Sequence, residues 1–422
     1  MALSSSVASG MGNIMAALGQ SNRISQVFLS GLTDRQLVEV SAPMQTPFPE
    51  LTELRLFSYG ETLSIIPDSF LDRSAPRLRL VDFFGIPLPG LPKLLLSATH
   101  LVHLTLFNIP HSGYFLPEAV VTLISMLSRL EVLSLEFQSP RSRPNSESRR
   151  LPPSKRSVIP ALDHFRFKGA IEYLEDVVAF IDAPQLNHFF ITFFNQINFD
   201  TPQLAHFINR TPELRGGDAR VQFDDDFARV GFPTSSGSLE ISISCREQDW
   251  QLSSIEQVCG FSLQSLSTVE NLYIEHQYGR LVWKNDAIEN TLWLHLLFPF
   301  TAVKNLYLSK EFAPGILAAM GELVGVRIME VLPGLQDIFV EGLQRSQPQP
   351  RPLRRFVAAR HLSGHPITIA GWGKLDVHKN PMWNAALNAA RKSHVTARTF
   401  LRSHSSCICS CTSGTRVPPG HG

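Results

Sequence analysis

The chain has 422 residues, and its 38 lysine and arginine residues nearly balance its 37 aspartate and glutamate residues, for a formal net charge of +1. This balance excludes a broad electrostatic attraction to nucleic acid or to an anionic membrane surface. Apolar residues make up 44% of the chain, which excludes global disorder, and no stretch approaches the ~18 uninterrupted apolar residues of a membrane-spanning helix.

A short apolar frame, LxxLxL, recurs along the chain and predicts a series of short β-strands. The clearest copy is Leu101-Val-His-Leu104-Thr-Leu106. In chain order, the copies begin at Ile24, Leu51, Leu78, Leu101, Leu130, Leu162, Leu186, Val269, Val303 and Leu335, with degenerate copies at Val221 and Leu239 and a last strand through Ile367 and Ile369. The intervals between Leu51 and Leu214 are close to the ~20–29 residues typical of leucine-rich repeats.

An amphipathic stretch follows most of these strands and predicts a helix that packs one face inward. The expected helices are Pro117–Leu127, Glu172–Ile181, Gln203–Ile208, Ile255–Leu266 and Gly315–Val324, with a helical turn at Asn13–Leu18. Prolines at the junctions (Pro76, Pro184, Pro212 and Pro333) are expected to stop each helix before the next strand.

The predicted fold is therefore an α/β leucine-rich-repeat solenoid, a horseshoe with short parallel strands on the concave face and helices on the convex face. The alternative is a doubly wound α/β sheet, which favours longer, fully apolar strands and a glycine-rich first turn. We expect a partly helical N-terminal segment (1–21), the solenoid (22–372) and an atypical, disordered C-terminal tail (373–422). A basic, proline- and serine-rich stretch (139–157) is expected to be a disordered insertion.

Several longer phrases resemble the leucine-rich-repeat regions of F-box proteins, particularly the large group of mushroom-forming fungi. They are PFPELTELRLF, SAPRLRLVDFFGIPLPGLPKLLLSATHLVHLTLFNIPHSGYF and PFTAVKNLYLSKEFAP, and the resemblance covers residues 13–372. It implies a substrate-binding subunit of a cullin–RING ubiquitin ligase, in which an N-terminal F-box docks the ligase core. The stretch before Ile24 is too short for an F-box, so we expect the F-box to be missing, as in a truncated gene product or an F-box-less relative.

The residues between the frame's leucines are expected to project from the concave surface. Two aromatic rows there would suit a protein partner, because buried aromatic side chains dominate interface energies. The first row is Phe57, Phe84 and Phe107, and the second is Phe190, Tyr273, Tyr307 and Phe339. The candidate partner-binding residues are Phe57, Phe84, Phe107, Arg166, Lys168, Phe190, Tyr273, Tyr307 and Phe339. Charged residues of both signs accompany them at Arg55, Asp82, Glu136 and Glu275, and a histidine row is expected from His103, His164 and His188.

Catalytic and metal-binding motifs are not evident. The triplet Asp224-Asp225-Asp226 lacks the spacing of a calcium loop, and Cys407, Cys409 and Cys411 lack the paired CxxC elements of a zinc site. We found no nucleophile elbow, phosphate-binding loop or dinucleotide fingerprint. These observations predict a protein with no cofactor, no metal and no enzymatic activity.

The sequence thus predicts a non-enzymatic protein-recognition module with a protein partner on the concave face, binding neither nucleic acid nor membrane. The alternative is a freestanding leucine-rich-repeat scaffold unrelated to ubiquitin. With only five cysteines and no targeting signal, we expect a reducing cytoplasmic or nuclear location.

Overall fold

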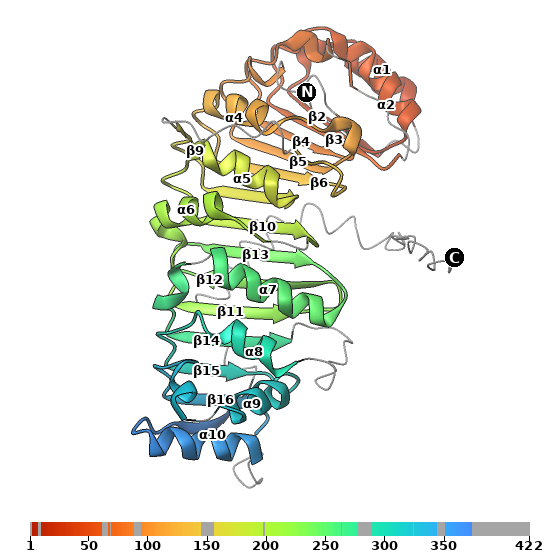
Figure 1. Cartoon of the computed structure of the whole chain (residues 1–422). Helices are drawn as coiled ribbons and strands as arrows, with labels where there is room; N and C mark the ends of the chain where they lie inside the picture. Colours follow the sequence, from red (N-terminus) through yellow and green to blue (C-terminus); the bar gives the residue numbers. More distant parts are fainter. Residues whose placement is uncertain are drawn as a thin grey trace, which may run out of the picture. The chain divides into compact units, whose positions relative to one another are not determined.

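The computed structural model describes residues 2–6, 10–60, 66–67, 69–87, 94–144, 156–196, 199–262, 264–276, 289–323, 325–343 and 351–373. Within these residues the fold is mixed α/β, with one large and mostly parallel sheet and helices lying along one of its faces (Figure 1). The tail predicted at 373–422 lies outside the described residues except for its first residue.

In the described part of the chain, the large sheet has 15 strands in the order β1-β2-β3-β4-β5-β6-β8-β10-β13-β12-β11-β14-β15-β16-β17. Its strands are β1 (Ala2–Ser6), β2 (Gln26–Leu32), β3 (Glu53–Ser58), β4 (Leu80–Phe84), β5 (His103–Ile109), β6 (Val132–Phe137), β8 (His164–Gly169), β10 (His188–Phe194), β11 (Asp218–Phe223), β12 (Phe227–Pro233), β13 (Ser238–Ser244), β14 (Asn271–His276), β15 (Asn305–Leu308), β16 (Asp337–Glu341) and β17 (Thr368–Trp372). A separate two-stranded sheet pairs β7 (Ser157–Val158) with β9 (Ile181–Asp182).

The helices lie between the strands in the sequence. They are α1 (Met11–Leu18), α2 (Asp34–Ser41), α4 (Pro117–Met126), α5 (Ile171–Ala179), α6 (Pro202–Arg210), α7 (Gln248–Ser262), α8 (Asn290–Leu297), α9 (Ala313–Gly321) and α10 (Arg351–Leu362). Short 3-10 helices lie at Ser21–Arg23, Pro43–Gln45, Phe70–Arg73, His111–Gly113, Pro212–Leu214, Gln264–Thr268 and Gly325–Met329. None of these described helices is long and apolar enough to cross a membrane.

Alternation within each strand places the core on one side of the sheet. In β5, Leu104 and Leu106 are buried, whereas His103, Thr105 and Phe107 point to the other side and are half-buried. Helix residues complete the core from the first side, as Leu204, Phe207 and Ile208 of α6 do. We call the other side the second face. It carries His103, Thr105 and Phe107 of β5 and the residues that occupy the equivalent positions in the other strands.

Neighbouring strands keep the LxxLxL frames aligned. Leu54 of β3 pairs with Val81 of β4, which pairs with Leu104 of β5, and Leu104 pairs with Leu133 of β6. Each core position therefore packs against the same position of the next unit, and one buried layer continues from strand to strand. The residues on the second face are aligned by the same register.

The expectation that the strands would all be parallel is wrong at one place. β11, β12 and β13 form an antiparallel meander, in which β12 pairs with both neighbours in the opposite direction. β13 then pairs in parallel with β10, and β11 pairs in parallel with β14. The two degenerate frames at Val221 and Leu239 belong to this meander, with β12 between them, because Asp224–Asp226 and Thr234–Gly237 form two tight turns.

Helix predictions succeeded where a strand frame flanked an amphipathic stretch, as at α4, α5, α6 and α9. The α7 helix begins earlier than expected, at Gln248 instead of Ile255. Three helices were not anticipated: α2, α8 and α10. The sequence held a signal for α2, since Thr33 and Gln36 form a capping box at its start.

The N-terminal segment contains a strand as well as the expected helix. β1 pairs with β2 in parallel, so the sheet starts at Ala2, before the frame at Ile24. The basic insertion is described at both ends: Ser142 is fully buried near its start, and Ser157 pairs with Ile181 at its end. Residues 145–155 of the insertion lie outside the described residues.

Candidate functional site

All nine candidate binding residues lie on the second face of the sheet, and each is half-buried. The strand register separates them into three groups. The first comprises Phe57, Phe84 and Phe107 on β3, β4 and β5; the second comprises Arg166, Lys168 and Phe190 on β8 and β10; the third comprises Tyr273, Tyr307 and Phe339 on β14, β15 and β16.

The first group forms an aromatic row across consecutive strands. Phe57 and Phe84 are in register and stack with ring centroids 6.3 Å apart. Phe107 continues the row, since it pairs with Phe84. Two residues that the sequence analysis missed extend this row: Phe28 contacts Phe57 edge-on at 5.7 Å, and the exposed Tyr59 lies 5.2 Å from Phe84.

Asp82 lies beside this aromatic row, next to Phe84 on the same face of β4. Its cross-strand neighbours are Arg55 on one side and Thr105 on the other. Burial raises the pKa of Asp82 to about 6, and the positive charge of Arg55 only partly opposes this shift. The row therefore combines aromatic surface with one poorly compensated carboxylate.

The second group is a basic and aromatic cluster. The guanidinium of Arg166 lies 5.2 Å from the centre of the Phe190 ring and also reaches Glu136 at 4.0 Å. The ammonium of Lys168 lies 5.9 Å from the ring of Phe194, which the sequence analysis did not single out. Cations over ring faces contribute attraction without fixing a single partner geometry.

The third group has the most closely stacked rings of the three groups. Tyr273 and Tyr307 stack at 4.3 Å, and Tyr307 and Phe339 stack at 4.5 Å. The stack ends on one side at Arg220, whose guanidinium lies 4.6 Å from the Tyr273 ring. Phe339 is the other end of the stack, and Trp372 meets the central ring, Tyr307, edge-on at 5.8 Å.

The expectation that Phe190 would belong to the same aromatic row as Tyr273 is wrong. Both occupy the same frame position, but the register places three residues of the meander between them: Glu240, Gly231 and Arg220. The polar residues of the meander therefore separate the second group from the third.

This polar region holds a buried cluster around Glu275 and a half-buried ion pair beside it, which sequence reasoning missed in part. The Arg220 guanidinium lies 3.4 Å from a carboxylate oxygen of Glu275, and the Gln222 amide donates to the other oxygen at 3.1 Å. Arg229 pairs with Glu240 at 2.9 Å. Glu275 was a candidate, whereas Arg220, Gln222 and Arg229 come from strands whose frame was degenerate.

The histidine row is partly formed. His164 and His188 are adjacent in register and stack at 4.3 Å, whereas Val132 separates His103 from His164. Burial lowers the pKa of His188, and the neighbouring His164 lowers it further. Burial also lowers the pKa of His103.

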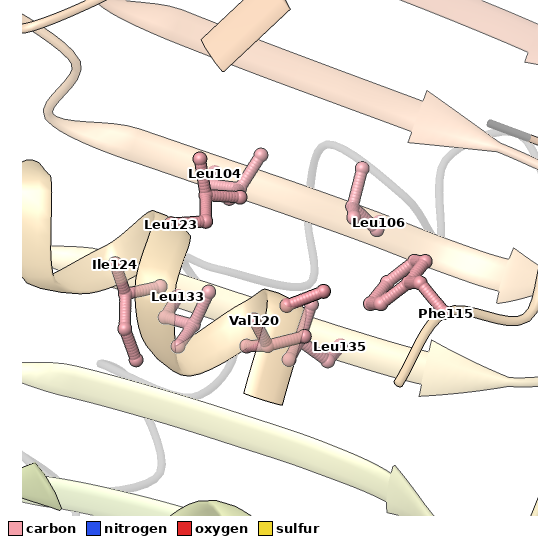
Figure 2. A pocket seen from close by; sticks show the side chains of 9 residues that line it. Leu104, Leu106, Phe115, Val120, Leu123, Ile124, Leu133 and Leu135 are labelled. Carbon is pink, nitrogen blue, oxygen red and sulfur yellow. The ribbon is translucent and has the colours of Figure 1, made fainter. Parts of the chain in front are cut away.

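One apolar cavity lies in the core, away from the second face. Figure 2 shows that it is lined by side chains of α4 and of the core side of β5 and β6, including Leu106, Val120 and Leu135. Its volume is about 10 Å³, roughly the room of one water molecule, but the lining offers no polar partner. It is a packing void rather than a ligand site.

Within the described residues, no three His, Cys, Asp or Glu side chains gather as they would around a metal ion. Asp224–Asp226 form the β11–β12 turn, in which Asp226 pairs with Arg246. Cys245 and Cys259 are buried free thiols, and Cys407, Cys409 and Cys411 lie outside the described residues.

Comparison of the chain with protein-family models found no match, and comparison with curated proteins found none at significant similarity. The resemblance to F-box leucine-rich-repeat proteins therefore stays a prediction from the sequence phrases alone.

Proposed function

We propose that residues 22–372, extended by the preceding strand β1, are a leucine-rich-repeat solenoid whose second face binds another protein. Support comes from the way successive strands align their frames and from the helices that follow most strands on the opposite side (Figure 1). Stacked units of this kind expose an extended binding surface on the strand side.

The observation that carries the proposal is the gathering of half-buried aromatic side chains on the second face. Phe57 and Phe84 stack on neighbouring strands near one end, and Tyr273, Tyr307 and Phe339 stack near the other. Aromatic side chains are enriched at protein–protein interfaces and supply much of their binding energy. Charged residues between the two areas would set specificity rather than attract any polyanion.

A double variant tests this proposal, in which Phe84 and Phe107 both become Ala. We expect it to lose the proteins that the wild-type chain captures reproducibly, while its circular dichroism and unfolding midpoint stay close to those of the wild type. The matched control is Leu362→Ala, because Leu362 is 87% exposed on α10, away from the second face. Equal capture by wild type and double variant would refute the proposed surface.

The finer proposal follows from the sequence resemblance: the chain acts as a substrate-binding subunit of a cullin–RING ubiquitin ligase. Affinity purification of this chain, and of a form extended by any upstream exon, tests that role. Recovery of cullin-complex components with the extended form would support it. Their absence with both forms would favour the alternative, a repeat scaffold unrelated to ubiquitin.

A further inference from the structure

The strongest unexplained group on the second face is the carboxylate of Asp82. Its Oδ1 atom is buried and makes no hydrogen bond to any described residue. Buried polar atoms almost always have a partner, and a buried carboxylate oxygen without one is costly. No described residue donates to this oxygen, while Asp82 as a whole is only half-buried and keeps some exposed surface on the second face.

Arg55 is the nearest cation in register, but its guanidinium is engaged elsewhere. It lies 3.6 Å from Glu53 on its own strand, and no ion pair within 4.0 Å joins it to Asp82. Glu53, Arg55 and Asp82 together carry one net negative charge. The local charge thus favours a cation over an anion at this place.

Aromatic side chains frame the same position. Phe84 follows Asp82 on the same face of β4, and its in-register neighbours are Phe57 and Phe107. Tyr59 adds a fourth ring beside Phe84. A side chain with a long apolar stem and a charged head would pack its stem on these rings and direct its head at the carboxylate.

We propose that Asp82, with Phe84 and Phe107, forms a subsite for a lysine or arginine side chain of the protein partner. The subsite deepens the proposed function and rests on it. An apolar partner side chain would bury the Asp82 carboxylate without giving it a hydrogen-bond donor, and an acidic side chain would be repelled by its negative charge. A basic side chain satisfies the carboxylate and uses the aromatic surface at the same time.

A displayed library of random twelve-residue peptides supplies the probes, selected separately on the wild-type chain and on Asp82→Asn. Asparagine keeps the size and removes the charge. We expect wild-type selections to enrich lysine or arginine at one peptide position, and selections on Asp82→Asn to lose that enrichment. A selected peptide should bind Asp82→Asn about tenfold or more weakly by fluorescence anisotropy.

Two controls separate the subsite from the surface. Asp182→Asn removes a carboxylate on β9, outside the large sheet, and should leave peptide affinity unchanged. Phe84→Ala should weaken the same peptides. Peptides that depend on Phe84 but show no basic enrichment, and bind Asp82→Asn as well as wild type, would overturn the subsite alone. That result would indicate that water satisfies Asp82. Peptides that bind Phe84→Ala and Asp82→Asn as tightly as the wild type would overturn the proposed surface itself.

Discussion

Tyr273 and Tyr307 lie on adjacent parallel strands with their rings stacked 4.3 Å apart and only 11° from parallel. Burial raises the pKa of both phenols above the ordinary value. Tyr307 also stacks on Phe339 and contacts Trp372. It is therefore the central ring of an aromatic column formed by Tyr273, Tyr307 and Phe339. The column is thus a structural element of the last strands as well as a candidate binding surface.

Tyr307→Ala should lower the free energy of unfolding by about 1–3 kcal/mol, because the central ring of the column is lost. Tyr307→Phe keeps the ring and should cost less than about 1 kcal/mol. Urea unfolding followed by fluorescence measures both values. Equal losses for the two variants would show that the hydroxyl group, not the stack, stabilises the column.

Asp82 should make stability depend on pH. Burial raises its pKa to about 6 in the folded chain, and the positive charge of Arg55 on β3 opposes this shift only in part. An unfolded aspartate has a pKa of about 3.9, so between about pH 4 and pH 6 the folded state holds the proton more tightly. The contribution of Asp82 to stability therefore falls as pH rises through this window.

The variant Asp82→Asn removes this titration. Its free energy of unfolding, relative to the wild type, should increase by about 1–3 kcal/mol between about pH 4 and pH 7.5. Denaturant titrations at several pH values measure the difference, and comparing the two proteins at each pH cancels the titration of all other groups. A difference that stays constant over this range would contradict the raised pKa.

Glu175 links two successive units and should be costly to remove. This buried α5 residue accepts hydrogen bonds from the backbone N–H groups of Gln203 at 3.0 Å and Leu204 at 2.7 Å, in the first turn of α6. Glu175→Ala leaves these donors without their acceptor and should destabilise the chain by about 2 kcal/mol. Glu175→Gln should lose less, since an amide oxygen still accepts.

Chemical denaturation measures the free energy of unfolding of both Glu175 variants, and Glu39→Ala serves as the control. Glu39 pairs with Arg35 on the surface of α2, where such a pair contributes about 0.5 kcal/mol or less. A similar loss from Glu175→Ala and Glu39→Ala would argue against the inter-helix cap.

Arg360 is a buried anchor for the turn before β16. It is fully buried in α10, and its guanidinium donates to the backbone oxygens of Leu332 at 2.9 Å and Leu335 at 3.3 Å. Arg360→Met should cost about 3 kcal/mol, because these carbonyl groups lose their donor. Arg360→Lys should rescue little, since an ammonium cannot reproduce the planar donor set.

The exposed Arg354 on the same helix provides the control, and Arg354→Met should change stability by less than about 0.5 kcal/mol. Thermal unfolding of the three variants measures the comparison. A loss for Arg360→Met no larger than that for Arg354→Met would exclude the anchoring role.

Strand positions and their buried sides could be read from the sequence wherever the frame was intact. Leu104 and Leu106 face the core and Phe107 faces away because successive side chains of a strand point to opposite sides. The β1 strand could not be read this way, since it has a single large apolar residue, Leu3. Its strand conformation depends on pairing with β2.

The meander had local signals that the repeat frame concealed. Asp224–Asp226 and Ser235-Ser236-Gly237 are turn-forming stretches between alternating segments, as in hairpins. No such local signal predicts that β13 pairs with β10 and that β11 pairs with β14. Strand order depends on which strand edges can come together, and the connecting helices and turns limit that choice.

The sequence by itself determined which side chains face the core and which reach the second face, because the two-residue period of a strand is a property of the backbone. Only the tertiary structure decided which second-face residues touch. It separated Phe190 from Tyr273, placed Arg220 on the Tyr273 ring and, among the described residues, gave Asp82 Oδ1 no hydrogen-bond partner. Such lateral contacts follow from strand order and register, which arise from packing between segments distant in the chain.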